Sequence, residues 1–199
     1  IMPLLFDMPW EELQTYKGTN PKPKDLTLFW ENALAEVGKI DPAMELIQDS
    51  FQAPGTECLN MYFTGVYGAR IHAKLLRPLN VETPHPAVLV FHGYAGSSGD
   101  WTDHLGLVTL GFTVAALDCR GHGGLSEDIG GVKGNTLRGQ IIRGLDDSPE
   151  KLLFRQIFLD TVQLARIVMS MPEVDPSRVG ATGRSQGGGL TLACSSLVP

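Results

Sequence analysis

One stretch, residues 179–190 with the sequence VGATGRSQGGGL, constrains the fold of this chain more than any other. A strand-forming run (RVGAT) enters a Gly-x-Ser-x-Gly turn, and a helix-forming run leaves it. Such a turn lifts the serine hydroxyl above a sheet, and side chains two positions either way would collide with neighbouring backbone. The pattern predicts Ser185 as a nucleophile. A glycine-rich helix start without a catalytic role is the alternative on this motif alone.

The rest of the chain favours a mostly parallel sheet flanked by helices. Residues 86–91 (PAVLVF) form a continuous apolar run, as expected of a strand covered on both faces, and residues 112–118 (FTVAALD) are predicted to form a second buried strand. Helix-like segments follow each run, at 101–111 and 151–171. Residues 58–77 alternate apolar and polar residues around two glycines, which predicts an antiparallel hairpin before the parallel strands. The fold class is therefore α/β.

The N-terminal region differs in its sequence pattern from the part that follows it. Residues 9–17 and 26–37 are predicted helices, separated by the breaker-rich loop GTNPKPKD, and Gly38 is expected to end the second one. We expect residues 1–43 to form a helical extension. Residues 44–199 are expected to form the N-terminal portion of a single α/β domain that continues beyond 199.

A second motif supports the catalytic interpretation of Ser185. His92-Gly93-Tyr94 directly follows the first buried strand. In α/β-hydrolases the oxyanion of an acyl-transfer reaction is bound by the N–H of the residue after the nucleophile and by an N–H of such a loop. These donors would be the backbone N–H groups of Gln186 and Tyr94, whereas His92 is interpreted as structural. The expected architecture is thus the α/β-hydrolase fold.

Composition and charge exclude several other classes of protein. With 43% hydrophobic and 19% charged residues the chain is globular, and its formal charge of −6 without a dense Lys/Arg run argues against a nucleic-acid partner. No signal peptide or membrane-spanning run is visible, so no membrane partner is expected. Three distant cysteines favour reduced thiols in a cytoplasmic protein. No metal-ligand spacing or cofactor motif is present, and serine hydrolysis requires neither.

Four stretches together resemble a specific family: RSQGGG at 184–189, VDPSRVGATG before it, HGY at 92–94 and LDCRGH at 117–122. With the opening FDMPWEELQTYKGTNPKPKD, they look like the acetyl xylan esterase/cephalosporin C deacetylase family, carbohydrate esterase family 7 of the α/β-hydrolase superfamily. The resemblance implies a cytoplasmic serine esterase that deacetylates small acetylated sugars, xylo-oligosaccharides and cephalosporin C. It also implies a homo-oligomer, typically a hexamer, with Ser185 as nucleophile and Tyr94 and Gln186 as oxyanion donors.

Two departures from the family pattern stand out. The family's Arg-Gly-Gln motif falls on Arg120-Gly121-His122, so histidine replaces glutamine. A literal RGQ at 138–140 has the wrong position and is interpreted as coincidence. Arg184 also replaces the glycine that commonly precedes the serine. Both changes leave the expected nucleophile and donors intact.

The base that would activate Ser185 is not evident. A serine hydroxyl needs one, and in this fold an acid and then a histidine follow the serine in the chain. No Asp, Glu or His follows Ser185, and His122 is the least implausible substitute among the five histidines upstream. We expect the polypeptide to continue past Pro199 and to carry the acid and histidine there. The alternatives are a non-catalytic binding or assembly protein on this scaffold and a serine peptidase.

Overall fold

The computed structural model of the chain describes residues 7–132 and 143–198. Three strands form the parallel part of the sheet: β4 (His85–Phe91), β5 (Thr113–Leu117) and β6 (Val174–Gly183). β4 lies in the middle and pairs in parallel with both of the others. Every residue of β5, including Thr113, is buried, as predicted for a strand covered on both faces.

An antiparallel part extends the same sheet. β2 (Thr56–Thr64) and β3 (Arg70–Pro78) form the predicted hairpin, with the short 3₁₀-helix η1 (Val66–Gly68) at its turn. β3 pairs antiparallel with β5, which gives the strand order β1-β2-β3-β5-β4-β6. The edge strand β1 (Glu45–Gln48) was not predicted, because only four residues, mostly exposed, pair with β2.

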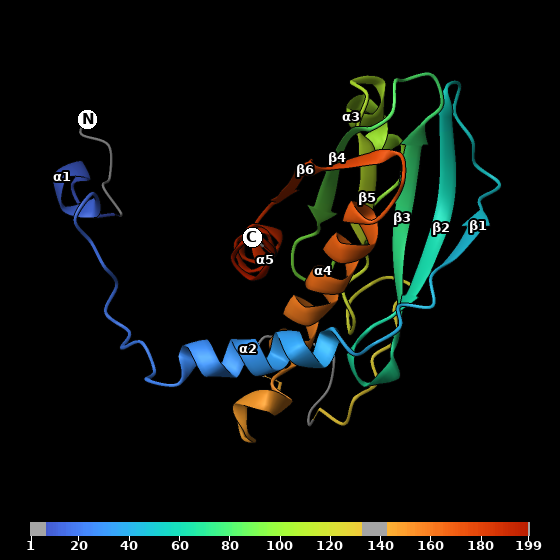
Figure 1. Ribbon diagram of the computed structural model, residues 1–199. Helices are drawn as coiled ribbons and strands as arrows, with labels where there is room; N and C mark the ends of the chain where they lie inside the picture. The colour runs from blue at the N-terminus through green and yellow to red at the C-terminus, as the bar shows by residue number, and fades with distance from the viewer. Residues whose placement is uncertain (1–6, 133–142, 199) are drawn as a thin grey trace.

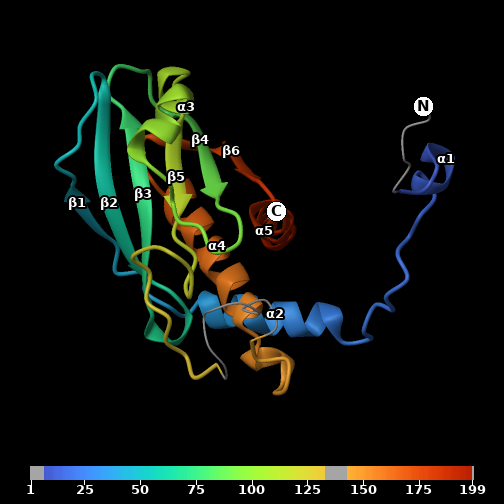
Figure 2. The same ribbon diagram turned by 180° about the vertical axis from the view of Figure 1, so that it is seen from behind.

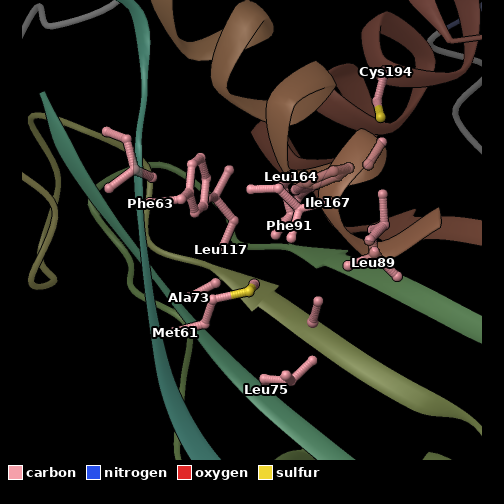
Figure 3. Close-up of a cluster of buried hydrophobic side chains, with 14 of the residues drawn as sticks. Met61, Phe63, Ala73, Leu75, Leu89, Phe91, Leu117, Leu164, Ile167 and Cys194 are labelled. Atoms are coloured by element: carbon pink, nitrogen blue, oxygen red, sulfur yellow. The ribbon is translucent and has the colours of Figure 1, made fainter. Parts of the chain in front are cut away.

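Helices cover both faces of the sheet (Figures 1 and 2). α4 (Leu153–Met169) and α5 (Gln186–Leu197) pack on one face, and the 3₁₀-helix η2 (Trp101–His104) with α3 (Leu105–Thr109) packs on the other. Alternate residues of β4 point to opposite faces: Leu89 joins the cluster with α4, and Val90 packs toward α3. Figure 3 shows this cluster with α4, in which side chains of the strands point toward α4 and α5.

The N-terminal helices differ in how they are supported. α2 (Leu26–Val37) ends at Gly38, as predicted, and packs Ala33 and Val37 against α4. The helix predicted over 9–17 is wrong in extent: α1 covers only Trp10–Leu13. No α1 residue is buried, and a short helix without packing partners is marginal in water. Figure 1 shows α1 lying apart from the sheet.

Two further boundaries differ from the sequence analysis. The predicted helix at 101–111 is split into η2 and α3, and the short 3₁₀-helix η4 (Pro149–Lys151) precedes α4. β6 begins before the strand-forming run RVGAT, already at Val174. A register shift between His85 and Ala87 of β4 lets the extra β6 residues bulge from the ladder. In the described part of the chain, no helix is long and apolar enough to cross a membrane.

Candidate active site

Ser185 lies between β6 and α5 in a strained backbone conformation. Its φ of 58° and ψ of −123° are rare for a residue with a side chain. The flanking glycines permit the tight turn: a Cβ at Gly183 would lie 2.7 Å from the carbonyl oxygen of Phe91, and one at Gly187 would collide with the same oxygen. The Ser185 side chain is exposed at the carboxyl edge of the sheet. This is the geometry that the Gly-x-Ser-x-Gly pattern predicts.

The loop that follows β4 (residues 92–100, the β4 loop) lies directly against this turn. β4 and β6 are neighbours, and Phe91 pairs with Gly183 at their carboxyl ends. A Cβ placed on Gly93 would lie 3.6 Å from the carbonyl oxygen of Arg184 and 3.9 Å from Cβ of Ser185. The sheet therefore brings the HGY motif and the serine turn together, as the sequence indicates.

The two expected oxyanion donors come from opposite sides of this junction. Gln186 is the first residue of α5, so its N–H has no acceptor within the helix and lies at the positive end of the helix dipole. Tyr94 follows Gly93 in the β4 loop and is 42% exposed. Their assignment as donors, like that of Ser185 as nucleophile, stays a prediction.

His92 is held by hydrogen bonds at both ring nitrogens. Nε2 accepts from the backbone N–H of Cys119 at 3.0 Å, so Nδ1 carries the proton and donates to the carbonyl of Gly93 at 2.7 Å. Burial lowers the pKa of His92, although the bond to Gly93 opposes this effect. A neutral ring with both nitrogens engaged agrees with a structural role.

His122, the departure from the family motif, contacts the side chain of Gln186. Its Nδ1 lies 3.1 Å from the carbonyl oxygen of Arg120 and therefore acts as a donor. In the neutral ring Nε2 is then an acceptor, and the amide nitrogen of Gln186 lies 2.8 Å from it. The ring also packs edge-on against Tyr94, with centroids 6.1 Å apart. His122 thus touches both residues of the expected oxyanion site.

Arg120, the first residue of the same motif, is fully buried and reaches away from the serine. Its guanidinium donates to both oxygens of Asp160, at 2.6 and 2.7 Å, and to Gln156 on α4 at 2.8 Å. It also donates to the carbonyl of Val66. Burial raises the pKa of Asp160, and the paired guanidinium opposes that rise. Arg120 therefore joins the segment after β5 to α4 and to the β2–β3 turn.

The sequence analysis did not single out Asp118 and His72, which form a second buried ion pair beside the site. Asp118 follows β5, and its Oδ2 lies 2.7 Å from Nδ1 of His72 on β3. Burial alone would raise the pKa of Asp118, but hydrogen bonds from His72, Leu125 and Ser98 lower it to about 2. The only sequence signal was a carboxylate at the end of a buried strand.

The histidines offer no clear base for Ser185. His72 pairs with Asp118, His85 bonds to Thr113, and His104 bonds to the carbonyl of Ser98. Both nitrogens of His92 are engaged, and His122 bonds to Gln186. We assign the base to none of these five residues.

Other features of the sequence analysis have separate outcomes. The literal RGQ at 138–140 lies outside the described residues. Two aromatic side chains near the loops also belong to the core: Trp101 of η2 is buried, and Phe112 packs against the same cluster. Within residues 7–132 and 143–198, no group of three His, Cys, Asp or Glu could hold a metal ion. The division at residue 43 stays a prediction.

A mixed sheet whose parallel strands lead into a strained serine turn and an adjoining glycine-bearing loop is the framework of an α/β-hydrolase. The sequence profile that describes acetyl xylan esterase (AXE1) matches residues 2–199. The chain belongs to this acetyl xylan esterase family.

Solved structures show the same relationship. Acetyl xylan esterase 1 from Thermoanaerobacterium sp. JW/SL YS485 is 59% identical, with a TM-score of 0.93 over 98% of this chain. An acetyl xylan esterase from Paenibacillus sp. R4 is 30% identical, with a TM-score of 0.87 over 96% of this chain. The chain spans 61% of the length of each. An S-formylglutathione hydrolase from Agrobacterium tumefaciens, 16% identical with a TM-score of 0.59, shares the fold over 78% of this chain and 58% of its own.

Proposed function

We propose that this chain carries the nucleophile and oxyanion site of a serine esterase that removes acetyl groups from small acetylated sugars. The observation that carries the proposal is the strained backbone of Ser185 beside Gly93. Strain at a non-glycine residue persists where surrounding structure enforces it, and such residues cluster at functional sites. Membership of the acetyl xylan esterase family supports the choice of acyl group.

The proposed chemistry proceeds through an acyl-enzyme. The Oγ of Ser185 attacks the acetyl carbonyl carbon while a base accepts its proton, and the carbonyl oxygen becomes an oxyanion. The backbone N–H groups of Tyr94 and Gln186 stabilise that charge. The bond to the sugar oxygen breaks as the sugar oxygen gains a proton. Water then attacks the acetyl-serine, which releases acetate and restores the hydroxyl of Ser185.

Acetylated xylo-oligosaccharides and cephalosporin C are the proposed substrates. The two similar structures are both called acetyl xylan esterases, which supports the first of these substrates. Cephalosporin C rests on the resemblance of the sequence to its deacetylases. Acetate release from each compound should be measured with the protein expressed from its complete gene. Release from both compounds would indicate a broad acetyl esterase, and release from xylan fragments alone would indicate a restricted one.

Labelling by a fluorophosphonate probe tests the nucleophile. The wild-type protein should be labelled and should hydrolyse p-nitrophenyl acetate, and Ser185→Ala should lose both properties. Ser195→Ala is the matched control, because Ser195 lies exposed on α5 and its hydroxyl donates to the carbonyl of Leu192 within the same helix. A folded wild-type protein that is not labelled would favour a non-catalytic binding protein, and cleavage of peptides in place of acetyl esters would favour a peptidase.

The assembly and location of the protein belong to the same proposal. The family resemblance supports a homo-oligomer, a hexamer, which light scattering of the purified protein would test. Cys58, Cys119 and Cys194 are all buried and unpaired, which supports a reducing compartment such as the cytoplasm. Cell fractionation would test that location.

A further inference from the structure

The β4 loop, which carries Tyr94, is fastened to the segment that follows β5 (the 118–125 segment). The backbone N–H of Cys119 donates to His92, and the N–H of Gly123 donates to the carbonyl of Gly96 at 2.9 Å. The N–H of Ser98 donates to Oδ1 of Asp118 at 2.5 Å. One contact precedes Tyr94 in the chain and two follow it. The backbone of Tyr94 therefore cannot shift without breaking bonds to the 118–125 segment.

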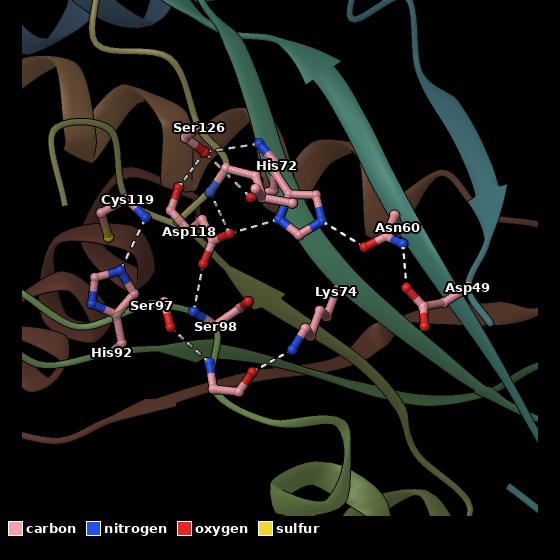
Figure 4. A network of polar contacts seen from close by, with 12 residues as sticks. Asp49, Asn60, His72, Lys74, His92, Ser97, Ser98, Asp118, Cys119 and Ser126 are labelled. Atoms are coloured by element: carbon pink, nitrogen blue, oxygen red, sulfur yellow. Dashed lines mark hydrogen bonds and ion pairs between the residues drawn. The ribbon is translucent and has the colours of Figure 1, made fainter. Parts of the chain in front are cut away.

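Asp118 is the centre of this arrangement, as Figure 4 shows. Its Oδ1 accepts from Ser98 of the β4 loop, and its Oδ2 accepts from the N–H of Leu125, at 3.0 Å, and from His72. Asp118 is 2% exposed, and its carboxylate has three donors around it. The other end of the 118–125 segment packs closely on the same carboxylate, since a Cβ on Gly124 would collide with it.

His72 supplies one of the three hydrogen bonds that keep this carboxylate ionised in the interior. Its Nε2 lies 2.9 Å from Oδ1 of Asn60, whose amide nitrogen donates to Asp49 at 2.7 Å. Because the Asp49 carboxylate only accepts, the amide oxygen of Asn60 must face His72. His72 then donates from both nitrogens, to Asn60 and to Asp118, and is an imidazolium. A buried carboxylate paired with a charged donor keeps its hydrogen bonds short and directional.

The 118–125 segment also reaches the second proposed donor. His122 bonds to the side chain of Gln186, whose backbone N–H is the partner of the Tyr94 N–H in the proposed oxyanion site. One short segment thus contacts both sides of the site. The distance between the two donors depends on the shape of this segment, and Asp118 fixes its two ends.

We propose that Asp118 is a positioning residue of this esterase, which holds the β4 loop through Ser98 and so sets the place of the Tyr94 N–H donor. The inference rests on the proposed function. Asp118 does not touch the substrate in this scheme; it acts through the loop backbone. In Asp118→Asn one carboxylate oxygen becomes an N–H₂ group, so at least one of the three donors loses its acceptor and His72 loses its counter-charge.

The test uses the protein expressed from its complete gene, with p-nitrophenyl acetate as substrate and phenylboronic acid as a mimic of the tetrahedral intermediate. Deleting one oxyanion donor lowers kcat by about 100-fold or more, so a misplaced donor should lower it by about 10-fold. We expect Asp118→Asn to show that loss with KM changed less than about threefold. Boronate affinity should fall by the same factor as kcat, because both depend on the oxyanion site.

Thr113→Val is the matched control. It also removes a buried polar contact, that of Thr113 with His85, by replacing a hydroxyl with a methyl group, but at the opposite end of β5. Its thermal stability should fall, while kcat and boronate affinity stay within about twofold of wild type. If Asp118→Asn does not fold, His72→Asn replaces it, since an amide nitrogen can still donate to Asp118 while the charge is lost. That variant should show a smaller, parallel loss of kcat and boronate affinity.

The inference is overturned if Asp118→Asn, or His72→Asn in its place, keeps both kcat and boronate affinity at the wild-type level. It is also overturned if kcat falls but boronate affinity does not, because the loss would then lie outside the oxyanion site. Failure of the proposed function has a separate signature: ester hydrolysis would persist in Ser185→Ala. The two failures are therefore distinguishable.

Discussion

The amide nitrogen of Gln186 lies 2.8 Å from Nε2 of His122, although the two residues are 64 positions apart in the chain. The contact joins the start of α5 to the segment after β5. In the family motif a glutamine stands in place of His122, and a glutamine side chain can also accept a hydrogen bond from an amide. His122 thus keeps a hydrogen-bond acceptor for the side chain of Gln186, although the residue type differs from that of the family motif.

This contact predicts how substitutions of His122 affect catalysis. His122→Ala removes the acceptor and loosens the first turn of α5, so kcat for p-nitrophenyl acetate should fall about fivefold, a fraction of the loss caused by deleting a donor outright. His122→Gln should stay within about twofold of wild type. Equal losses in both variants would show that the imidazole itself, and not the hydrogen bond, is needed.

Two glycines that follow Ser185 should differ sharply in their tolerance of alanine. In Gly187→Ala the new Cβ would collide with the carbonyl of Phe91, a backbone atom that cannot move away, so folding or activity should be lost. Gly189 lies two residues further along α5 with open space around it. Gly189→Ala should raise the free energy of unfolding by about 0.5–1 kcal/mol through helix propensity alone. Thermal unfolding and esterase assays of both variants check this contrast.

Two of the arginines that pair with carboxylates, Arg120 and Arg70, should contribute very unequally to stability. Arg120→Lys cannot reproduce the two-pronged bond to Asp160 in a fully buried site, so it should lower the free energy of unfolding by about 3 kcal/mol. Arg70→Lys is the control, because the Arg70–Glu45 pair is about half exposed. It should cost less than about 1 kcal/mol. Urea unfolding measures both, and similar losses would contradict the assignment of Arg120 to the core.

Asp118 should make stability depend on pH in the acid range. Its pKa is lowered to about 2 in the folded protein, against 3.8 for the ordinary carboxyl group. The stabilisation is therefore complete above the ordinary pKa and is lost as pH falls from about 4 toward 2, by about 2 kcal/mol in all. Urea unfolding at several pH values should show a shallower acid slope in Asp118→Asn than in wild type. Superimposable slopes would contradict the assignment.

The cysteine thiols should be unreactive in the native protein. Burial raises the pKa of Cys119 far above its ordinary range, with the charges of Asp160 and Asp118 acting in the same direction. Burial also raises the pKa of Cys58 and of Cys194. Since the thiolate is the reactive form, iodoacetamide should modify none of the three quickly before unfolding and all three in guanidinium. Rapid native modification of one equivalent would show an opening that the structure does not contain.

The sequence predicted the central elements of the fold because their signals are local and strong. The apolar run that becomes β4, the stripe of α4 and the hairpin of β2 and β3 need no knowledge of partners. The edge strand β1 was missed because it exists only through its pairing with β2. The helix at 9–17 was predicted too long because periodicity does not reveal whether a packing surface is present.

The candidate site was likewise predicted only in part, where its signals are local. The serine turn was visible because its glycines lie two positions from Ser185, and the strained backbone follows from that local requirement. The pairing of His72 with Asp118 joins residues 46 positions apart, and nothing near either residue indicates the other. Such contacts depend on which strands become neighbours in the sheet. A single sequence does not contain that information in readable form.

The neighbouring positions of β4 and β6 also have a kinetic consequence. Tyr94 and Gln186 follow β4 and β6, two strands that are neighbours in the sheet but are separated by almost half of the chain. Parallel pairing over so long a separation closes a large loop, and such non-local contacts form slowly. During refolding the local β2–β3 hairpin and α4 should appear before these two strands dock. The rate at which Ser185 reacts with a fluorophosphonate should then rise late in refolding, when β4 and β6 pair.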